Sequence, residues 1–227
     1  MSNICIIPAR GGSKRIPRKN IKEFLGKPII AYSIQAALDS GLFDEVMVST
    51  DDLEIADIAK KYGAKVPFMR SKKNSGDFAT TFDVIEEVIQ VYKSQGKVFE
   101  NICCIYSCAP FVKAKTLNLA HEKLIDKKFD TVFPIIAFSF PIQRALSESD
   151  GKIEMIYKEN LNSRSQDLEE RFHDAGQFYW CNTIELLKIK KILTPNSGGI
   201  IISELEAQDI DTETDWKLAE LKYQLLK

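Results

Sequence analysis

The sequence lacks several features that would assign it to a class at once. Its 227 residues show no excess of one charge, since 31 Lys and Arg balance 32 Asp and Glu to a net charge of −1. This balance excludes a general nucleic-acid-coating protein and a polybasic membrane binder. The longest mostly apolar stretch, residues 132–142, contains two prolines and is too short to cross a bilayer. Internal repeats and low-complexity tracts are also absent.

Cysteine is sparse and unpatterned. The five cysteines form no C-x-x-C pair, and their number is odd. Buried, reduced thiols explain them better than a metal or redox site does. The first residues show neither a basic segment nor an apolar run of the length that a signal peptide has. We therefore expect a soluble, cytoplasmic protein that binds neither nucleic acid nor membrane.

The remaining composition is that of a globular domain, with 44% hydrophobic residues. Short apolar runs predict strands at 4–7, 46–49, 102–106, 131–137, 178–181 and 199–203, with an extended piece at 65–69. Helical spacing predicts helices at 28–40, 53–62, 82–92, 115–127, 184–191 and 216–226. This alternation predicts one α/β domain, residues 1–227, with a mainly parallel sheet sandwiched by helices. The pattern weakens over 138–175, which we interpret as an inserted arm or flap used in dimerisation.

A strongly basic segment directly follows the first predicted strand. Residues 8–22 contain no acid and six cations, namely Arg10, Lys14, Arg15, Arg18, Lys19 and Lys22. Ligands bind at the carboxyl ends of strands in open α/β sheets, and Gly11 and Gly12 let backbone N–H groups approach an anion. The segment predicts a polyphosphate cradle, the alternative being a solvated surface loop. It matches neither the P-loop nor the G-x-G-x-x-G spacing, which disfavours an NAD-linked oxidoreductase.

A strongly acidic segment lies near the other end of the chain. Residues 204–215 contain six acids and no base. In an extended segment Asp209 and Asp211 would point the same way, with Cα atoms roughly 6.6 Å apart. Two such carboxylates can hold Mg²⁺ together with waters and substrate phosphates. An EF-hand is disfavoured because Thr214 stands where glycine is required, whereas helix capping by Asp211 or Thr212 is a compatible alternative.

These two segments complement each other chemically. A triphosphate needs both cations and a divalent metal to react, and phosphoryl or nucleotidyl transfer depends on positioning and charge neutralisation. The residues therefore predict a transferase that uses a nucleoside triphosphate.

The motifs that carry this chemistry also resemble a known family. IPARGGSKRIPRKN (7–20), VSTDDLEIADIA (48–59), FHDAGQFYW (172–180) and QDIDTETDW (208–216) resemble the CMP-sugar-acid synthetases, cytidylyltransferases that activate sialic, ketodeoxyoctonic and related acids. The likeness spans nearly the whole chain. YSCAPF (106–111), FPIQRAL (140–146) and FHDAGQFYW are most similar to the branch that acts on pseudaminic acid, a nine-carbon keto sugar acid.

The resemblance implies a Rossmann-like fold, CTP as substrate, Mg²⁺ as cofactor and a homodimer. The anomeric hydroxyl of the sugar acid would attack the α-phosphate, and pyrophosphate would leave. By motif match, the expected nucleotide-binding residues are Arg10, Gly11, Gly12, Ser13, Lys19, Asn20, Arg70 and Thr81. Tyr106 is expected to bind the nucleotide as well, although it departs from the family pattern. The expected Mg²⁺ ligands are Asp209 and Asp211, and the expected catalytic residues are Lys19, Arg10 and Asp211.

The sugar-acid site is expected from the same resemblance at Gln143, Arg144, His173, Asp174 and Gln177. Tyr106 departs from the Gln-Pro-Thr-Ser-Pro run of the sialate branch and is expected to pack on the nucleoside. Other roles for these residues stay open. His173 and Asp174 could form only a hydrogen bond within their loop, and Arg144 could lie at a dimer interface or on the surface. The alternative functions stay open as well, a synthetase for sialic acid, legionaminic acid or ketodeoxyoctonate, or a nucleotide-binding regulator on the same fold.

Overall fold

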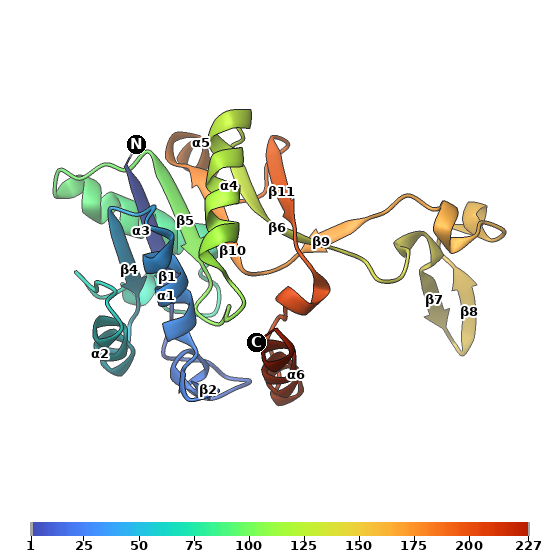
Figure 1. The fold of residues 1–227 in the computed structure, drawn as a ribbon, viewed down its shortest axis with the longest axis horizontal. Coiled ribbons are helices and arrows are strands. Elements are labelled where there is room, and N and C mark those ends of the chain that lie inside the picture. Colours follow the sequence, from blue (N-terminus) through green and yellow to red (C-terminus); the bar gives the residue numbers. More distant parts are fainter. Residues whose placement is uncertain (1, 227) are drawn as a thin grey trace.

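The strands form where the sequence has short apolar runs that can be covered on both sides. The computed structural model describes residues 2–226 (Figure 1). The strands are β1 Asn3–Pro8, β2 Glu23–Phe24, β3 Lys27–Pro28, β4 Glu45–Ser49, β5 Asn101–Ile105, β6 Thr131–Ala137, β7 Leu146–Ser149, β8 Lys152–Met155, β9 Phe172–Asp174, β10 Phe178–Asn182 and β11 Ser197–Ile201. The α-helices are α1 Ile30–Ser40, α2 Leu53–Lys61, α3 Thr81–Ser94, α4 Ala114–Lys127, α5 Thr183–Ile189 and α6 Glu213–Leu225.

The main sheet has seven strands in the order β11-β6-β10-β5-β1-β4, with β9 paired to β6. β1 runs parallel to β4 and β5, and β11 runs parallel to β6. β10 is antiparallel to both neighbours, and its first residue, Phe178, pairs with Ile105 at the end of β5. The predicted mainly parallel sheet is confirmed. The chain enters β10 at the edge where β1 and β5 end, so residues just before Phe178 join the loops that follow those strands.

Alternation along the strands divides the core between two faces. Cys5 and Ile7 pack with α1, α2 and α4, whereas Ile4 and Ile6 pack with α3 and α5. A separate cluster around Phe24 and Trp216 joins the β2–β3 hairpin to α6. Four of the five cysteines are buried and all five are free, as expected for reduced thiols.

Some element boundaries differ from the sequence prediction. α1 begins at Ile30, not Pro28, because residues 23–28 form a β2–β3 hairpin whose turn residues, Leu25 and Gly26, have φ of 47° and 94°. The extended piece expected at 65–69 makes a single β-bridge to the sheet. β11 lies two residues earlier than predicted. α6 starts at Glu213 because Thr212 forms a capping box there, which confirms the capping alternative for Thr212.

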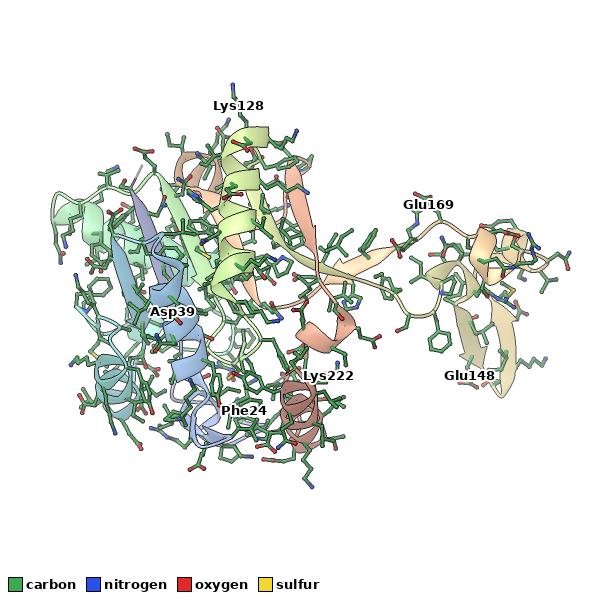
Figure 2. The ribbon with its side chains drawn as sticks, in the orientation of Figure 1. Phe24, Asp39, Lys128, Glu148, Glu169 and Lys222 are labelled. Carbon is green, nitrogen blue, oxygen red and sulfur yellow. The ribbon has the colours of Figure 1, made fainter. Side chains whose placement is uncertain are left out.

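An arm projects from the sheet between β6 and β9 (Figure 1). The stem is the antiparallel β6–β9 ladder, and the Phe138 N–H donates to the Arg171 carbonyl at 2.9 Å. Beyond it lies the β7–β8 hairpin, with Glu148 near its end and Glu169 back toward the stem (Figure 2). Large apolar side chains of the arm are exposed, among them Phe140 at 85%. Across residues 2–226, none of the helices combines the length and apolar character needed to span a membrane.

Candidate functional site

A cavity of about 450 Å³ lies at the carboxyl ends of β1 and β5. Its volume is in the range of small-molecule sites, and its position is where α/β sheets bind ligands. Four cations of the basic segment line it, namely Arg10, Lys14, Arg15 and Lys19. The structure therefore places this segment at the wall of that cavity.

The acidic segment meets the basic one at this cavity. Lys19 Nζ donates to the Ile210 carbonyl at 2.6 Å and lies 3.6 Å from Asp211 Oδ1. Arg15 Nη1 donates to Asp211 Oδ2 at 2.8 Å. One step further, Lys22 pairs with Glu213 at 2.6 Å. Residues nearly 200 positions apart thus pair beside the cavity, whose lining includes Arg15 and Lys19 from one segment and Asp209 and Ile210 from the other.

Asp209 and Asp211 lie where the acidic segment meets the basic one. Asp209 lines the cavity, whereas Asp211 is not among its lining residues and pairs with Arg15 and Lys19. Burial raises the pKa of Asp209, and the negative charge of Asp211 raises it further. Such repulsion between neighbouring carboxylates is relieved by a cation. Within residues 2–226 there is no cluster of three or more metal-binding side chains, so these two carboxylates would need water and phosphate oxygens to complete a Mg²⁺ shell.

The three residues expected to bind the nucleoside lie at the same cavity. Arg70, Thr81 and Tyr106 all line it. The Arg70 guanidinium donates to the Ser49 hydroxyl at 3.0 Å and to the Ser49 carbonyl at 2.5 Å, and its burial lowers its pKa. Tyr106 Oη lies 3.3 Å from Thr81 Oγ1. The structure therefore brings the three expected nucleoside residues together.

The remaining cradle residues act partly through the backbone. Asn20 lines the cavity but uses its amide internally, donating to the Arg10 carbonyl at 2.8 Å and accepting from Ser107 Oγ at 2.8 Å. Ser13 lines the cavity, whereas Gly11 and Gly12 are not among the lining residues. The Gly11 N–H donates to Asp51 Oδ1 at 2.9 Å. Asn20 thus holds the cradle's path rather than presenting a free amide.

A second cavity, of about 540 Å³, adjoins the first. Tyr106, Gly176, Gln208 and Asp209 line both, which makes one continuous cleft.

His173 and Asp174 line this second cavity, as expected for sugar-acid contacts. The Asp174 carboxylate accepts from Tyr179 Oη at 2.7 Å and from the Gly176 N–H at 2.8 Å. His173 Nδ1 lies 2.9 Å from the Asp174 carbonyl, a local His–Asp contact. Gln177 is buried, and its amide donates to the Glu206 carbonyl at 2.5 Å, away from the cavity lining. Two of these three expected residues therefore face the cleft.

Gln143 and Arg144 lie on the arm and line neither cavity of the cleft. Gln143 donates to the Glu169 carbonyl at 2.8 Å, and Arg144 donates to Ser165 Oγ at 3.2 Å. Within one chain the structure does not bring them to the site, and their sugar-acid role stays a prediction.

Two acidic positions near the cradle were not expected from the sequence. Asp77 pairs with Arg10 at 2.8 Å and with Lys14 at 2.5 Å, and both cations hold its pKa below the ordinary value. Asp52 pairs with Arg18 at 2.5 Å. The signal for Asp52 was available, because Asp51 and Asp52 follow a buried strand at the same sheet edge as the basic segment.

Comparison with known proteins places this geometry in a family. Residues 4–191 match the family model described as cytidylyltransferase. The chain is 44% identical over 226 residues to a pseudaminic acid cytidylyltransferase of Campylobacter jejuni, covering 99% of this chain and 97% of the relative. It is 34% identical over 233 residues to a CMP-N,N′-diacetyllegionaminic acid synthase of Legionella pneumophila, covering 97% and 95%.

The fold has a solved counterpart as well. A CMP:2-keto-3-deoxy-manno-octonic acid synthetase complexed with CTP superposes with a TM-score of 0.70 at 16% identity, covering 100% of this chain and 99% of the other. At that identity the likeness concerns the Rossmann-like fold alone. The family model and the full-length relatives carry the assignment: this chain belongs to the cytidylyltransferase family of nucleotidyltransferases, as its motifs predicted.

Proposed function

We propose that this chain transfers CMP from CTP to the anomeric hydroxyl of pseudaminic acid, giving CMP-pseudaminic acid and pyrophosphate in nucleotide-sugar biosynthesis. The observation that carries the proposal is the continuous cleft, in which a cavity lined by four cations and by Arg70, Thr81 and Tyr106 adjoins a second cavity lined by His173 and Asp174. The 44% identity to the Campylobacter jejuni enzyme over almost the full chain supports pseudaminic acid as the acceptor. Localisation in the cytoplasm belongs to the same proposal.

Charge neutralisation is the main contribution of the protein to this reaction. Attack on the α-phosphate places negative charge on its non-bridging oxygens and on the leaving pyrophosphate. Arg10 and Lys19 line the cavity from the same segment and present their cationic groups to it. In the unliganded chain both are paired, Arg10 with Asp77 and Lys19 with the Ile210 carbonyl, so the triphosphate replaces existing partners.

A Mg²⁺ ion fits the carboxylate pair of the acidic segment. Asp209 and Asp211 would hold it, and when bound it would supply further charge neutralisation at the phosphates. Arg15 and Lys19 already pair with Asp211. These two ion pairs hold the Asp211 carboxylate beside the cavity.

The adjoining cavity would take the sugar acid. His173 lines it, and Asp174 fixes the Tyr179 hydroxyl there. Tyr106 lies between the two cavities and packs edge-on against Tyr179, with ring centroids 5.4 Å apart. The acceptor and the nucleotide would therefore share Tyr106 and Asp209 as common walls. Because Asp209 belongs to the proposed metal pair, the anomeric hydroxyl would lie near the phosphates.

A homodimer formed through the arm is part of the proposal. Phe140, Leu146, Ile153 and Leu161 are exposed on the arm, an apolar surface that a second copy would cover. Gln143 and Arg144 lie on the same arm, and their contacts in the structure are with other residues of that arm.

The dimer is tested by sedimentation velocity. Leu146→Asp combined with Ile153→Asp should give a monomer, whereas Ile184→Asp, at an exposed apolar position on α5, should leave the dimer intact. A monomeric unaltered protein would refute the dimer.

Pyrophosphate release with CTP and Mg²⁺ tests the activity itself. The acceptors are pseudaminic acid, N-acetylneuraminic acid, diacetyllegionaminic acid and ketodeoxyoctonate. Pseudaminic acid should give the highest kcat/KM. Faster turnover of another acid in the panel would reassign the acceptor, and CTP binding without turnover of any acid would favour the nucleotide-binding regulator.

A further inference from the structure

Arg18 differs from its neighbouring cations in where its side chain goes. Arg10, Lys14, Arg15 and Lys19 line the nucleotide cavity, and Arg18 is not among the lining residues. Its guanidinium instead spans the Asp52 carboxylate through two bonds, of 2.5 and 3.0 Å, and also donates to Glu54 at 2.5 Å. Two-pronged guanidinium–carboxylate pairs fix geometry as well as charge. Arg18 thus joins the basic segment to the start of α2.

Asp52 is fixed from a second direction by α2. Its side chain accepts from the Ile55 N–H at 3.0 Å and caps that helix. Arg18 holds the pKa of Asp52 down to about 2, so the carboxylate stays charged at neutral pH. The Arg18 side chain therefore pairs with a carboxylate that is itself held in place at the N-terminus of α2.

Gly11 lies against the same carboxylate. A Cβ at Gly11 would come within 2.7 Å of Asp52 Oδ2 and 3.0 Å of Asp52 Cβ. The Gly11 N–H is already bonded to Asp51. The need for glycine here comes from the close approach of Asp52, and Gly11 is not among the residues that line the cavity.

The backbone of Arg18 depends on this arrangement. Its φ of 55° and ψ of 27° are left-handed, which is uncommon for a residue with a side chain and requires support from its surroundings. Lys19 follows immediately and starts the short 3-10 helix Lys19–Ile21. The direction in which Lys19 leaves the turn is therefore set at Arg18.

We propose that Arg18 and Asp52 form a positioning clamp that holds the basic segment in the shape in which Arg10 and Lys19 face the triphosphate. Gly11 has no Cβ and therefore allows the Asp52 side chain to approach the segment closely. The clamp rests on the proposed CTP site and touches no substrate. Arg10 and Lys19 flank Gly11 and Arg18, so both ends of the cradle are fixed at this point.

The first test measures CTP binding with Mg²⁺ by calorimetry and thermal unfolding by circular dichroism. Arg18→Ala and Asp52→Asn should each raise the Kd for CTP by about tenfold or more, because small displacements of charged groups are costly. The double variant should do little more than either alone. Lys188→Ala, which removes an exposed pair with Glu185 on α5, should leave the Kd unchanged.

A second test is a rescue, which a purely structural role would not produce. Gly11→Ala should weaken CTP binding by about tenfold or more in the unaltered chain. In an Asp52→Gly background, where no side chain remains to collide with, adding Gly11→Ala should weaken binding less than threefold. Asn182→Gly removes a comparable cap from α5 at the far edge of the sheet and should leave CTP binding unchanged.

The outcomes separate the clamp from the function on which it rests. Failure of the unaltered protein to bind CTP would contradict the proposed function and the clamp together. Normal CTP binding by Arg18→Ala, or an equal effect of Gly11→Ala with and without Asp52, would refute the clamp alone. Where Arg18→Ala does not fold, Asp52→Asn tests the pair from its other side, and normal CTP binding by that variant would also refute the clamp.

Discussion

Replacing Lys19 by alanine tests the junction between the two charged segments. The side chain is 23% exposed, its Nζ is 2.6 Å from the Ile210 carbonyl, and it is 3.6 Å from Asp211. A preorganised cation that stabilises charge on a reacting phosphate is typically worth about 10²–10³ in kcat. We expect a loss of that size in Lys19→Ala, measured as pyrophosphate release at saturating CTP.

The same substitution should have a smaller effect on stability. A hydrogen bond from a charged group contributes about 1.5–3 kcal/mol, and partial exposure places Lys19 toward the lower figure. For a chain of this length, Tm falls by about 2–4 °C per kcal/mol. The protein should therefore remain folded at 25 °C, and unfolding cannot explain the lost activity.

Lys123→Ala is the matched control, because Lys123 Nζ donates to the Gly199 carbonyl at 2.7 Å on the α4 side of the sheet. It should reproduce the Tm change and leave kcat unaltered. A Lys19→Ala protein that is folded and retains kcat within threefold would refute the assignment of Lys19 to the reacting phosphate.

Three further substitutions follow from the same geometry. Asp211→Asn should lower turnover at least tenfold and raise the Mg²⁺ concentration for half-maximal rate, and an unchanged Mg²⁺ titration would remove Asp211 from the metal site. Asp77→Asn should lower KM for CTP a few-fold, because its carboxylate occupies cations that the triphosphate would bind; Asp57→Asn, at an exposed ion pair on α2, should not change KM. Arg18 lowers the pKa of Asp52 to about 2, from about 3.9 in the unfolded chain. The stabilisation that the ionised Asp52 carboxylate gives to the folded protein is therefore complete above pH 5 and is lost as the pH falls toward 2. The Tm difference between the unaltered chain and Asp52→Asn should be constant above pH 5 and shrink below pH 4, and a pH-independent difference would contradict the ion pair.

The order of strands and helices was predictable because each buried strand is an apolar run and each helix has a clear periodicity. The antiparallel direction of β10 was not, since Phe178–Asn182 is buried on both faces and reads like its parallel neighbours. The β2–β3 hairpin was missed because Leu25 takes a left-handed φ of 47°, which its residue type does not indicate. Packing of Phe24 on Trp216 compensates for such local preferences.

The candidate site could be predicted where a segment of the chain carries charges of only one sign. Basic and acidic segments with no charge of the other sign pointed to a shared anion and metal site, and Lys19 and Asp211 do lie together. Internal partners could not be predicted, because pairing depends on folded distances. Nothing in the sequence distinguished Arg18, which binds Asp52, from Arg15, which lines the cavity.

The contact between Lys19 and Ile210 joins positions 191 residues apart. At about 5–20 residues per second, a ribosome makes the second partner roughly 10–40 seconds after the first. The cationic half of the cleft therefore exists on the nascent chain long before its acidic half, and the lining is incomplete until residues 209–211 have emerged. We expect CTP capture to begin only after residues 209–211 have emerged and packed against the basic segment.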